Sequence, residues 1–305
     1  MPSYSDHRSA RTSVINFFRN LLRWPAAETV LMAPTTDGLL KDLAKRIIPP
    51  EYLYGENAVR QIGRDGIKYE LHMNDMMDHQ FYFRIDKPHW DGFLKLIKSD
   101  FIVFDIGAKN GLMTMPLALK AAHVHSYEPS QKNFTRLARH IALNALTNVS
   151  LHRSGIGDGH QKVKLYQAEL YNLGMNRIMN APDQATECEE IEINTLDGEM
   201  DEMELTRVDA IKIDVEGYEM NVLLGADKTI SHFRPVLFIE LIQKTLALYG
   251  HSPVQVIDFV KQKGYHCFDA KTLREMTTPL DRVETDIICL HKTSAQLAEF
   301  YHRAS

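Results

Sequence analysis

The chain has 305 residues, of which 44% are hydrophobic and 25% charged, and this composition is typical of a globular protein with a sizeable core. Its net charge of -5 gives no general attraction to a phosphate backbone, so we expect no nucleic acid partner. The cysteines are too scattered for a disulfide framework or a CxxC metal site, so we expect small buried hydrophobic residues at Cys188, Cys267 and Cys289. No apolar run approaches the roughly 20 residues that span a bilayer, and no signal peptide is recognisable, so we expect a cytoplasmic protein without a transmembrane segment.

Residues 1–88 are predicted to form an N-terminal extension of helices and a β-hairpin. In "RTSVINFFRNLLRW" (11–24) apolar residues follow helical spacing and arginines lie on the other side, which predicts a basic amphipathic helix. Such a helix can pack on its own domain, form a homodimer contact, or make a peripheral contact with an anionic membrane surface. A second helix is predicted over 38–47. The alternating segments 66–75 and 81–85 predict the two strands of the hairpin.

Residues 89–305 are predicted to form an α/β domain. Short apolar runs alternate with helical patterns, which is typical of parallel strands covered on both faces by crossover helices. The strands are predicted at 101–106, 123–128, 149–153, 208–214, 235–241, 265–270 and 286–291. The helices are predicted at 111–121, 130–145, 217–230 and 253–263. Ligands bind beyond the carboxyl ends of the strands in such sheets, so the site is expected there.

The stretch "FDIGAKNG" (104–111) joins the first of these strands to a helix. Its glycines permit positive φ, but the second glycine of a dinucleotide fingerprint is absent, and the chain has no Walker A sequence. The pattern favours a nucleoside ligand without a pyrophosphate and with a cationic group near Asp105, and S-adenosylmethionine is such a ligand. Glu128 ends the second strand, where a carboxylate can accept both ribose hydroxyls. The alternative is that the glycines only form a tight turn and Glu128 only caps the next helix.

Three carboxylates crowd one strand end, because Asp214 ends an apolar strand and Glu216 and Glu219 follow at once. Neighbouring carboxylates repel each other, and their pKa values rise unless a cation or hydrogen-bond donors compensate. A sulfonium or a metal ion would provide that compensation. Alternatively, Glu216 and Glu219 only stabilise the positive end of the following helix, which leaves Asp214 unexplained.

The segment 171–206 is strongly acidic from Asp183 onward. Residues 188–196 alternate like an edge strand, whereas 172–186 is predicted to be a flexible loop over the site. An acidic loop over the site would repel a polyanionic substrate. We therefore expect the substrate to be a neutral or cationic small molecule, or a carbohydrate.

Taken together, the motifs resemble those of FkbM-type methyltransferases over about residues 100–270. They occur in the order "FDIGAKNG", "YEPS", "NALTNVSLH", "GIGDG", "INTLDG", "IKIDVEGYE" and "RPVLFIEL". The resemblance implies an α/β fold with the class I, Rossmann-like seven-stranded methyltransferase sheet. It also implies S-adenosylmethionine as the methyl donor and O-methylation of a hydroxyl on a sugar, glycan or small natural product.

By the same resemblance, Glu128 is expected to hold the ribose of the cofactor, while Ser154, Gly155 and Ile156 flank the adenine. Lys109 departs from the family, in which G-A-N is usual, and it can pair with the methionine carboxylate or point to solvent. The residues implied at the methionine end are Asp105, Gly107, Ala108, Lys109 and Gly111.

Methyl transfer to a hydroxyl requires alignment of the acceptor and removal of its proton. Candidates for the general base are Asp214, Glu216 and Glu240, the last of which lies in the fifth strand. The same oxygen ligands would suit Mg²⁺, and the sequence leaves base and metal open, so no residue is predicted as a dedicated metal ligand. His123 and His125 lack metal-ligand spacing and are expected to be packing residues. The alternative function is a non-catalytic S-adenosylmethionine-binding partner or regulatory module, which has no need to keep these acids together.

Overall fold

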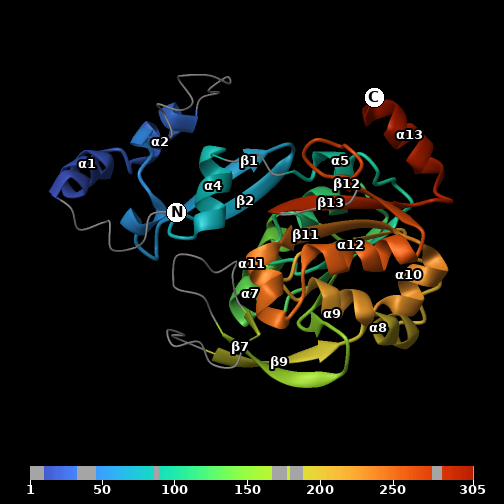
Figure 1. The fold of residues 1–305 in the computed structure, drawn as a ribbon. Coiled ribbons are helices and arrows are strands. Elements are labelled where there is room, and N and C mark those ends of the chain that lie inside the picture. The colour runs from blue at the N-terminus through green and yellow to red at the C-terminus, as the bar shows by residue number, and fades with distance from the viewer. Residues whose placement is uncertain are drawn as a thin grey trace. The chain divides into compact units, whose positions relative to one another are not determined.

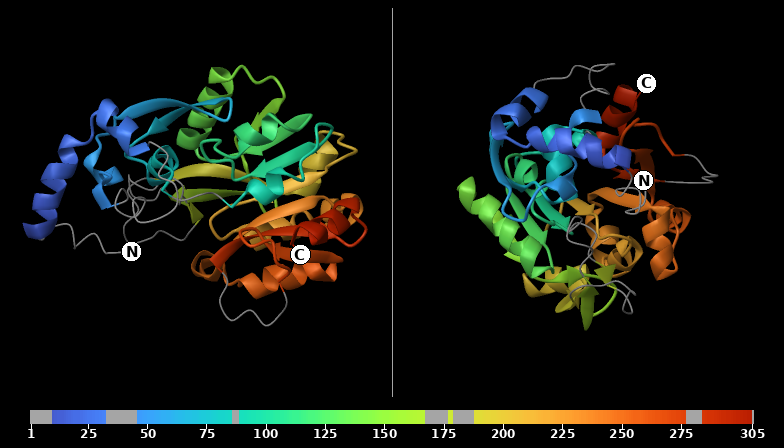
Figure 2. Two further views of the ribbon diagram at one scale, coloured as in Figure 1. Left: turned by 90° about the horizontal axis from the view of Figure 1, so that it is seen from above. Right: turned by 90° about the vertical axis from the view of Figure 1, so that its left-hand side faces the viewer.

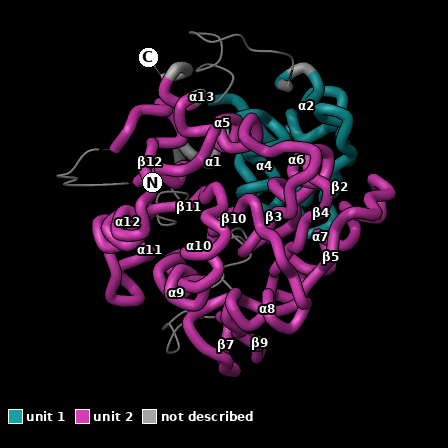
Figure 3. Tube along the Cα trace, turned by 90° about the vertical axis from the view of Figure 1, so that its right-hand side faces the viewer, with its two compact units in different colours: residues 1–87, 168–174 teal, residues 88–167, 175–305 magenta. Residues whose placement is uncertain are grey.

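A computed structural model describes residues 10–32, 46–85, 89–166, 177–178, 188–276 and 284–304, shown in Figure 1 and from two further directions in Figure 2. The chain divides into two compact units, one of residues 1–87 with 168–174 and the other of the remaining residues (Figure 3). The smaller unit contains the N-terminal helices and a hairpin. The larger unit contains the sheet at whose edge the candidate site lies.

The smaller unit begins with two helices. α1 (Ala10–Leu21) confirms the predicted amphipathic helix. The sequence pattern did not predict α2 (Pro25–Met32). Pro25 is the first residue of this helix, and proline is tolerated there because the N–H group that it lacks would have no partner within the helix. The helix predicted at 38–47 lies mostly outside the described residues. Among the side chains of α1 that the structure describes, Phe17, Phe18 and Leu21 are exposed apolar ones.

The hairpin consists of β1 (Val59–Arg64) and β2 (Ile67–His72), which pair antiparallel. Asp65 and Gly66 join them with φ values of 52° and 80°, because a two-residue hairpin turn of this kind requires positive φ at both positions. β2 confirms one predicted strand. The prediction of a second strand at 81–85 is wrong, because the strand that pairs with β2 is β1, which precedes it in the chain.

Residues 81–83 instead end a helix, α4 (Met76–Phe83). Asp75 begins this helix, and its side chain accepts hydrogen bonds from the N–H groups of Met77 and Asp78 at 3.0 and 3.1 Å. Five alternating residues at the end of such a short helix cannot be distinguished from a strand by periodicity alone.

A buried carboxylate, Glu28 of α2, holds the smaller unit together. It accepts hydrogen bonds from the hydroxyl groups of Tyr54 at 2.9 Å and Tyr82 at 3.2 Å. Arg60 of β1 lies 2.7 Å from the same carboxylate. Tyr54 follows a short 3-10 helix, η2 (Glu51–Leu53), whereas Tyr82 belongs to α4. Because a buried carboxylate is costly without partners, this network joins helices and hairpin into one unit.

The larger unit contains a seven-stranded sheet. Its strands are β3 (Ile102–Ile106), β4 (His123–Tyr127), β5 (Val149–His152), β10 (Ala210–Ile213), β11 (Val236–Ile242), β12 (Tyr265–Asp269) and β13 (Glu284–His291). They lie in the order β12-β13-β11-β10-β3-β4-β5, and β13 is antiparallel to both of its neighbours. Each strand overlaps a predicted one. The predicted fold class, an α/β fold with a class I, Rossmann-like seven-stranded sheet, is therefore confirmed.

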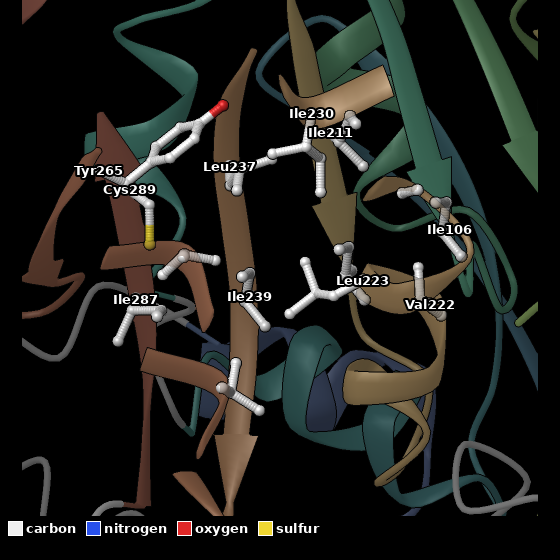
Figure 4. Close-up of a cluster of buried hydrophobic side chains, with 14 of the residues drawn as sticks. Ile106, Ile211, Val222, Leu223, Ile230, Leu237, Ile239, Tyr265, Ile287 and Cys289 are labelled. Atoms are coloured by element: carbon white, nitrogen blue, oxygen red, sulfur yellow. The ribbon is translucent and has the colours of Figure 1, made fainter. Parts of the chain in front are cut away.

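Helices cover both faces of this sheet (Figures 1 and 2). On one face, Ile106, Ile211 and Ile239 of three adjacent strands pack in one cluster with Val222 and Ile230 (Figure 4). The helices that supply this cluster are α8 (Leu196–Glu202), α9 (Glu219–Leu224), α10 (Asp227–Phe233), α11 (Gln243–Leu246) and α12 (Pro253–Gln262).

The opposite face of the sheet has its own apolar cluster. Val103 of β3 and Phe238 of β11 belong to it, whereas their chain neighbours Phe104 and Leu237 belong to the first cluster. This alternation is the expected result of the strand geometry, in which successive side chains point to opposite faces. The helices on this side are α5 (Asp91–Leu94), α6 (Thr114–Ala118) and α13 (Ala295–Ala304).

Each helix predicted in the larger unit overlaps an observed one, although α6 spans only Thr114–Ala118 of the predicted 111–121, and one prediction needs correction. The helix predicted over 217–230 is two helices, α9 and α10, which are separated at Gly225. The prediction at 130–145 corresponds to α7 (Gln131–Leu143). The sequence did not predict α5, α8, α13, α11 (Gln243–Leu246) or the 3-10 helix η4 (Ala247–Tyr249).

A second, four-stranded sheet has the order β6-β9-β7-β8. The strand predicted at 188–196 is confirmed as β9, but it is an inner strand of this small sheet, paired with β6 and β7, and not an edge strand. Most of the predicted flexible loop, 172–186, lies outside the described residues. The strands of this sheet are β6 (Gly155–Ile156), β7 (Gln161–Tyr166), β8 (Arg177–Ile178) and β9 (Cys188–Asn194).

Two of the three cysteines are buried, as predicted. Cys267 and Cys289 face each other across β12 and β13, with their Sγ atoms 3.5 Å apart. Cys188, the first residue of β9, is exposed, so the prediction that it is buried is wrong. Among the described helices, none is long and apolar enough to cross a membrane.

The close approach of Gly225 to Gly157 yields a stability prediction. A Cβ at Gly225 would overlap the backbone oxygen of Gly157, which follows β6. We expect Gly225→Ala to lower the free energy of unfolding by about 3 kcal/mol, the upper end of the usual cost of overpacking, in urea denaturation followed by circular dichroism. Gly159→Ala is the control, because no atom lies within 4 Å of the added methyl group. Equal stability of the two variants would contradict the contact.

Candidate active site

The loop after β3, residues 107–111, passes close to the end of β10. Gly107 begins this glycine loop with a φ of 76°, a conformation that favours glycine. A Cβ there would overlap the backbone oxygen of Asp214, just beyond β10. The N–H groups of Gly107 and Ala108 both donate to the carbonyl of Tyr127, the last residue of β4, at 3.0 and 2.9 Å. The glycine loop is therefore fixed between the carboxyl ends of three neighbouring strands.

A buried ion pair supports the glycine loop. Lys212 of β10 and Asp105 of β3 are opposite each other in the register of the sheet, and Lys212 Nζ lies 3.0 Å from Asp105 Oδ1. Lys212 also donates to the carbonyl of Gly107 at 2.6 Å. Thr114 Oγ1 donates to Asp105 Oδ2 at 2.6 Å. Asp105 is fully buried, so its carboxylate acts on the loop through Lys212.

Glu128 directly follows β4, at the predicted strand end. Its Oε2 accepts the N–H of Lys109 at 2.8 Å, and its Oε1 accepts the N–H of Ser130, which precedes α7, at 2.9 Å. Burial raises the pKa of Glu128 to about 7, although these two N–H groups oppose the shift. Glu128 thus contacts the start of the next helix, as the alternative interpretation required, and it also holds the glycine loop.

The remaining predicted cofactor residues lie after β3 and after β5. Gly111 has a φ of 90°, and a side chain there would meet Leu137 of α7. Gly155 and Ile156 form β6, and Ser154 is half-buried immediately before them. The side chain of Ile156 belongs to the apolar core, so this residue can offer a ligand only its backbone.

Three carboxylates that the sequence suggested as candidate bases lie together at the same edge. Asp214 follows β10, and Glu240 lies on the adjacent strand, β11. Glu216 joins them from the following turn, in which it has a left-handed φ of 57°. One oxygen of each carboxylate lies within 4.8 Å of the others. The structure therefore brings the three predicted catalytic residues into one group, the carboxylate triad.

The side chain of Lys109 ends between two members of the triad. Its Nζ lies 2.9 Å from Asp214 Oδ1 and 2.8 Å from Glu216 Oε1. The side chain is only 12% exposed, so Lys109 does not point to solvent. Lys212 approaches from the other side, with its Nζ 3.8 Å from Asp214 Oδ2. Asp214 therefore lies between two ammonium groups.

These two lysines determine which carboxyl groups are charged. Burial alone would raise the pKa of Asp214, but the ammonium groups of Lys109 and Lys212 hold it below its usual value. Burial and the negative charge of Asp214 raise the pKa of Glu240 well above its usual value. Burial would lower the pKa of Lys109, but the nearby carboxylates of Asp214 and Glu216 raise it well above its usual value. Asp214 is therefore expected to be ionised at neutral pH, whereas the shift of the Glu240 pKa favours its protonated form.

Glu219, the third acid after the fourth predicted strand, binds its own turn. Its Oε1 accepts the N–H groups of Val215 at 3.1 Å and Gly217 at 3.0 Å. Burial raises its pKa to about 7. Glu219 therefore stabilises the turn that precedes α9.

Lys212 is the residue of this site that the sequence analysis did not single out. The signal lies in "VDAIKID" (208–214), where a lysine stands inside an apolar strand. Lysine is rarely buried without a partner, so an acid on an adjacent strand was to be expected, and Asp105 is that acid. No pattern in the sequence indicated the contact of Lys109 with Glu216, because the two residues are 107 positions apart.

The histidines of β4 are packing residues, as predicted. His125 stacks on Phe104 with ring centroids 4.9 Å apart, and its Nδ1 lies 3.3 Å from Nε2 of His152. His123 contacts the hydroxyl group of Ser150 at 2.9 Å. Burial lowers the pKa of His125 to about 4, so it is neutral at pH 7.

Comparison with known proteins relates the larger unit to methyltransferases. The family model described as "Methyltransferase FkbM domain" matches residues 105–267. "Methyltransferase 1" of Beauveria bassiana (strain ARSEF 2860) is 26% identical over 148 residues, and the match covers 42% of this chain but only 59% of that protein. Methyltransferase FkbM of Methylobacillus flagellatus KT has a TM-score of 0.43 and 19% identity, with 90% of this chain and 60% of that chain covered. TYW2 of M. jannaschii in complex with AdoMet has a TM-score of 0.39 and 15% identity, and the match covers 78% of this chain and 87% of that chain.

The buried pair beneath the glycine loop predicts a large loss of stability. Lys212→Met would leave the carboxylate of Asp105 buried without its cation, and we expect about 3–5 kcal/mol less free energy of unfolding in urea denaturation. The matched control is Lys162→Met in β7, whose exposed ammonium lies 3.6 Å from Glu192 and should contribute little. If Lys212→Met were as stable as Lys162→Met, the buried pair would not support the loop.

Proposed function

Because the chain belongs to the FkbM methyltransferase family, we propose that it is an S-adenosylmethionine-dependent O-methyltransferase that acts on a hydroxyl of a sugar, glycan or small natural product. The observation that supports this most is the meeting of the glycine loop, Glu128 and Asp214 at the carboxyl ends of adjacent parallel strands. Ligands of open α/β sheets bind at this edge. We assign the catalytic domain to residues 89–305 and an N-terminal extension to residues 1–88.

The residues at this edge fit the proposed cofactor. Each oxygen of Glu128 accepts one backbone N–H, which leaves further lone pairs for the ribose hydroxyls. The glycine loop would border the methionine portion, and Ser154 and Gly155 would border the adenine. Asp105 would contribute by holding the glycine loop through Lys212. When bound, the cofactor supplies a methyl group on a sulfonium centre.

Asp214 is our candidate for the proton acceptor, since the flanking ammonium groups keep it ionised. The raised pKa of Glu240 makes its protonated form more favourable, and in that form it donates a hydrogen bond instead of accepting a proton. Glu216 holds Lys109 in place. A carboxylate with a lowered pKa is a weaker base than one near neutrality, so we expect alignment of the acceptor to contribute more of the rate than proton removal does.

The function is tested by incubating the protein with labelled S-adenosylmethionine and a panel of sugars, macrolides and small phenols. Transfer of label to a hydroxyl oxygen supports the proposal. Cofactor binding without transfer to any member of the panel favours the non-catalytic binding module. No binding at millimolar cofactor, measured by calorimetry, would overturn the assignment of the site.

Glu128 predicts a pH-dependent affinity for the demethylated product, S-adenosylhomocysteine. Lowering the pH protonates Glu128, whose pKa burial raises to about 7, and the neutral carboxyl group is a weaker acceptor for the ribose hydroxyls. We expect affinity to fall about tenfold between pH 8 and pH 6 in calorimetric titrations. Glu128→Gln is the control, because it cannot ionise and should show weaker binding without this pH dependence. Parallel pH profiles for the two proteins would exclude Glu128 from the ribose site.

Asp214→Asn should separate catalysis from cofactor binding. The amide is nearly the same in shape but cannot take up the acceptor proton, so we expect methyl transfer to fall at least about a hundredfold. Cofactor affinity should stay within about tenfold, or roughly 1.4 kcal/mol. Asp201→Asn, which changes an exposed carboxylate of α8, should alter neither quantity. Near-normal turnover in Asp214→Asn, or equal losses of binding and turnover, would make Glu216 or Glu240 the better candidate.

A further inference from the structure

The carboxylate triad has the spacing of a divalent cation site. Oxygen ligands lie about 2.0–2.6 Å from Mg²⁺ or Ca²⁺, so two ligands of one ion are at most about 5 Å apart. The oxygens of Asp214, Glu216 and Glu240 lie within 4.8 Å of one another, and so they meet this condition. By this geometry alone, a metal ion would be expected to bind and activate the acceptor hydroxyl.

A side chain of the protein itself, Lys109, lies against two of the three carboxylates that would hold such an ion. Lys109 Nζ lies 2.9 Å from the nearest oxygen of Asp214 and 2.8 Å from that of Glu216, which are distances of direct ion pairs. A divalent ion held by the same oxygens would lie within a few ångströms of this ammonium group. Like charges that close repel strongly where little water is present, so the lysine and the metal exclude each other.

The backbone fixes Lys109 in this place. Its φ of 52° is left-handed, which is uncommon for a residue other than glycine, and its N–H donates to Glu128 at 2.8 Å. The side chain is nearly buried, at 12% exposure. The ammonium group is therefore part of the built site and not a mobile surface charge.

We propose that the ammonium group of Lys109 takes the place of a divalent cation among Asp214, Glu216 and Glu240, so that the site works without metal. The claim that the site binds no metal does not depend on the proposed function. The catalytic part of the proposal rests on the proposed function: a fixed positive charge beside the acceptor oxygen stabilises the negative charge that develops there as the proton leaves. Lys109 thus performs the electrostatic task of a metal ion, and a chelator cannot remove it.

The test is to remove the lysine and ask whether a metal binds. Lys109→Asn is the chosen variant, because asparagine tolerates left-handed φ. In calorimetric titrations with Mn²⁺, the wild-type protein should show no saturable binding in the millimolar range, and Lys109→Asn should bind at least about a hundredfold more tightly than wild type. Adding Glu240→Gln to Lys109→Asn should abolish the gain, since it removes one ligand.

A matched control is available in β7. Lys162 also lies near two carboxylates, at 4.0 Å from Glu190 and 3.6 Å from Glu192, but all three side chains are exposed. Lys162→Asn should gain no Mn²⁺ binding. If Lys109→Asn binds Mn²⁺ no more tightly than Lys162→Asn, the proposal is overturned.

Two measurements on the wild-type protein decide the matter even if Lys109→Asn does not fold. A saturable Mn²⁺ site that Glu240→Gln abolishes would overturn the proposal, and its absence would support it. Methyl transfer should survive EDTA, whereas loss of transfer that Mg²⁺ or Mn²⁺ restores would overturn it. The titrations need neither acceptor nor methyl donor. Failure of this inference is therefore distinguishable from failure of the proposed function, which would appear as missing cofactor binding and missing transfer.

Discussion

Two lysines placed among carboxylates organise the edge of the sheet at which the candidate site lies. Lys212 pairs with Asp105 across β10 and β3 and holds the carbonyl of Gly107, while Lys109 reaches from the glycine loop to Asp214. Buried charges are tolerated only when they are paired and hydrogen-bonded, so the loop and the strand ends take up positions in which Asp105, Asp214 and Glu216 each have a lysine partner. The shape of the glycine loop and the ionised state of Asp214 therefore have a common cause.

Local periodicity was sufficient to predict the main sheet but not every neighbouring element. The seven strands were recognisable because strands buried on both faces are continuous apolar runs between helical patterns. The strand expected at 81–85 failed because five alternating residues also fit the end of a helix, while the Asp65 to Gly66 turn was the more specific signal. The break at Gly225 could not be predicted, since it accompanies a backbone contact with Gly157, far away in the sequence.

Most acids of the candidate site were predictable, because their residue type and their place at strand ends are both visible in the sequence. The side chain that compensates their charge could not be predicted. Crowded carboxylates at Asp214 and Glu216 implied a cation, and the sequence suggested a sulfonium or a metal ion, whereas the structure supplies Lys109. Residue types at strand ends are local information. Which side chain of another loop reaches them depends on the assembled sheet and on a left-handed residue that no local pattern marks.

The internal ammonium groups also affect how this edge of the sheet distinguishes ligands by charge. Carboxylates without partners would retain a cationic molecule far longer than a neutral molecule of the same shape. Lys109 and Lys212 remove much of that preference, because they already balance the acids. A sulfonium donor loses its positive charge when it gives up its methyl group, and such a site would then hold the spent molecule nearly as well as the fresh one. Under the proposed function the spent donor would compete with the fresh donor, and the rate of transfer in a mixture would follow the ratio of the two molecules more than the concentration of the donor alone.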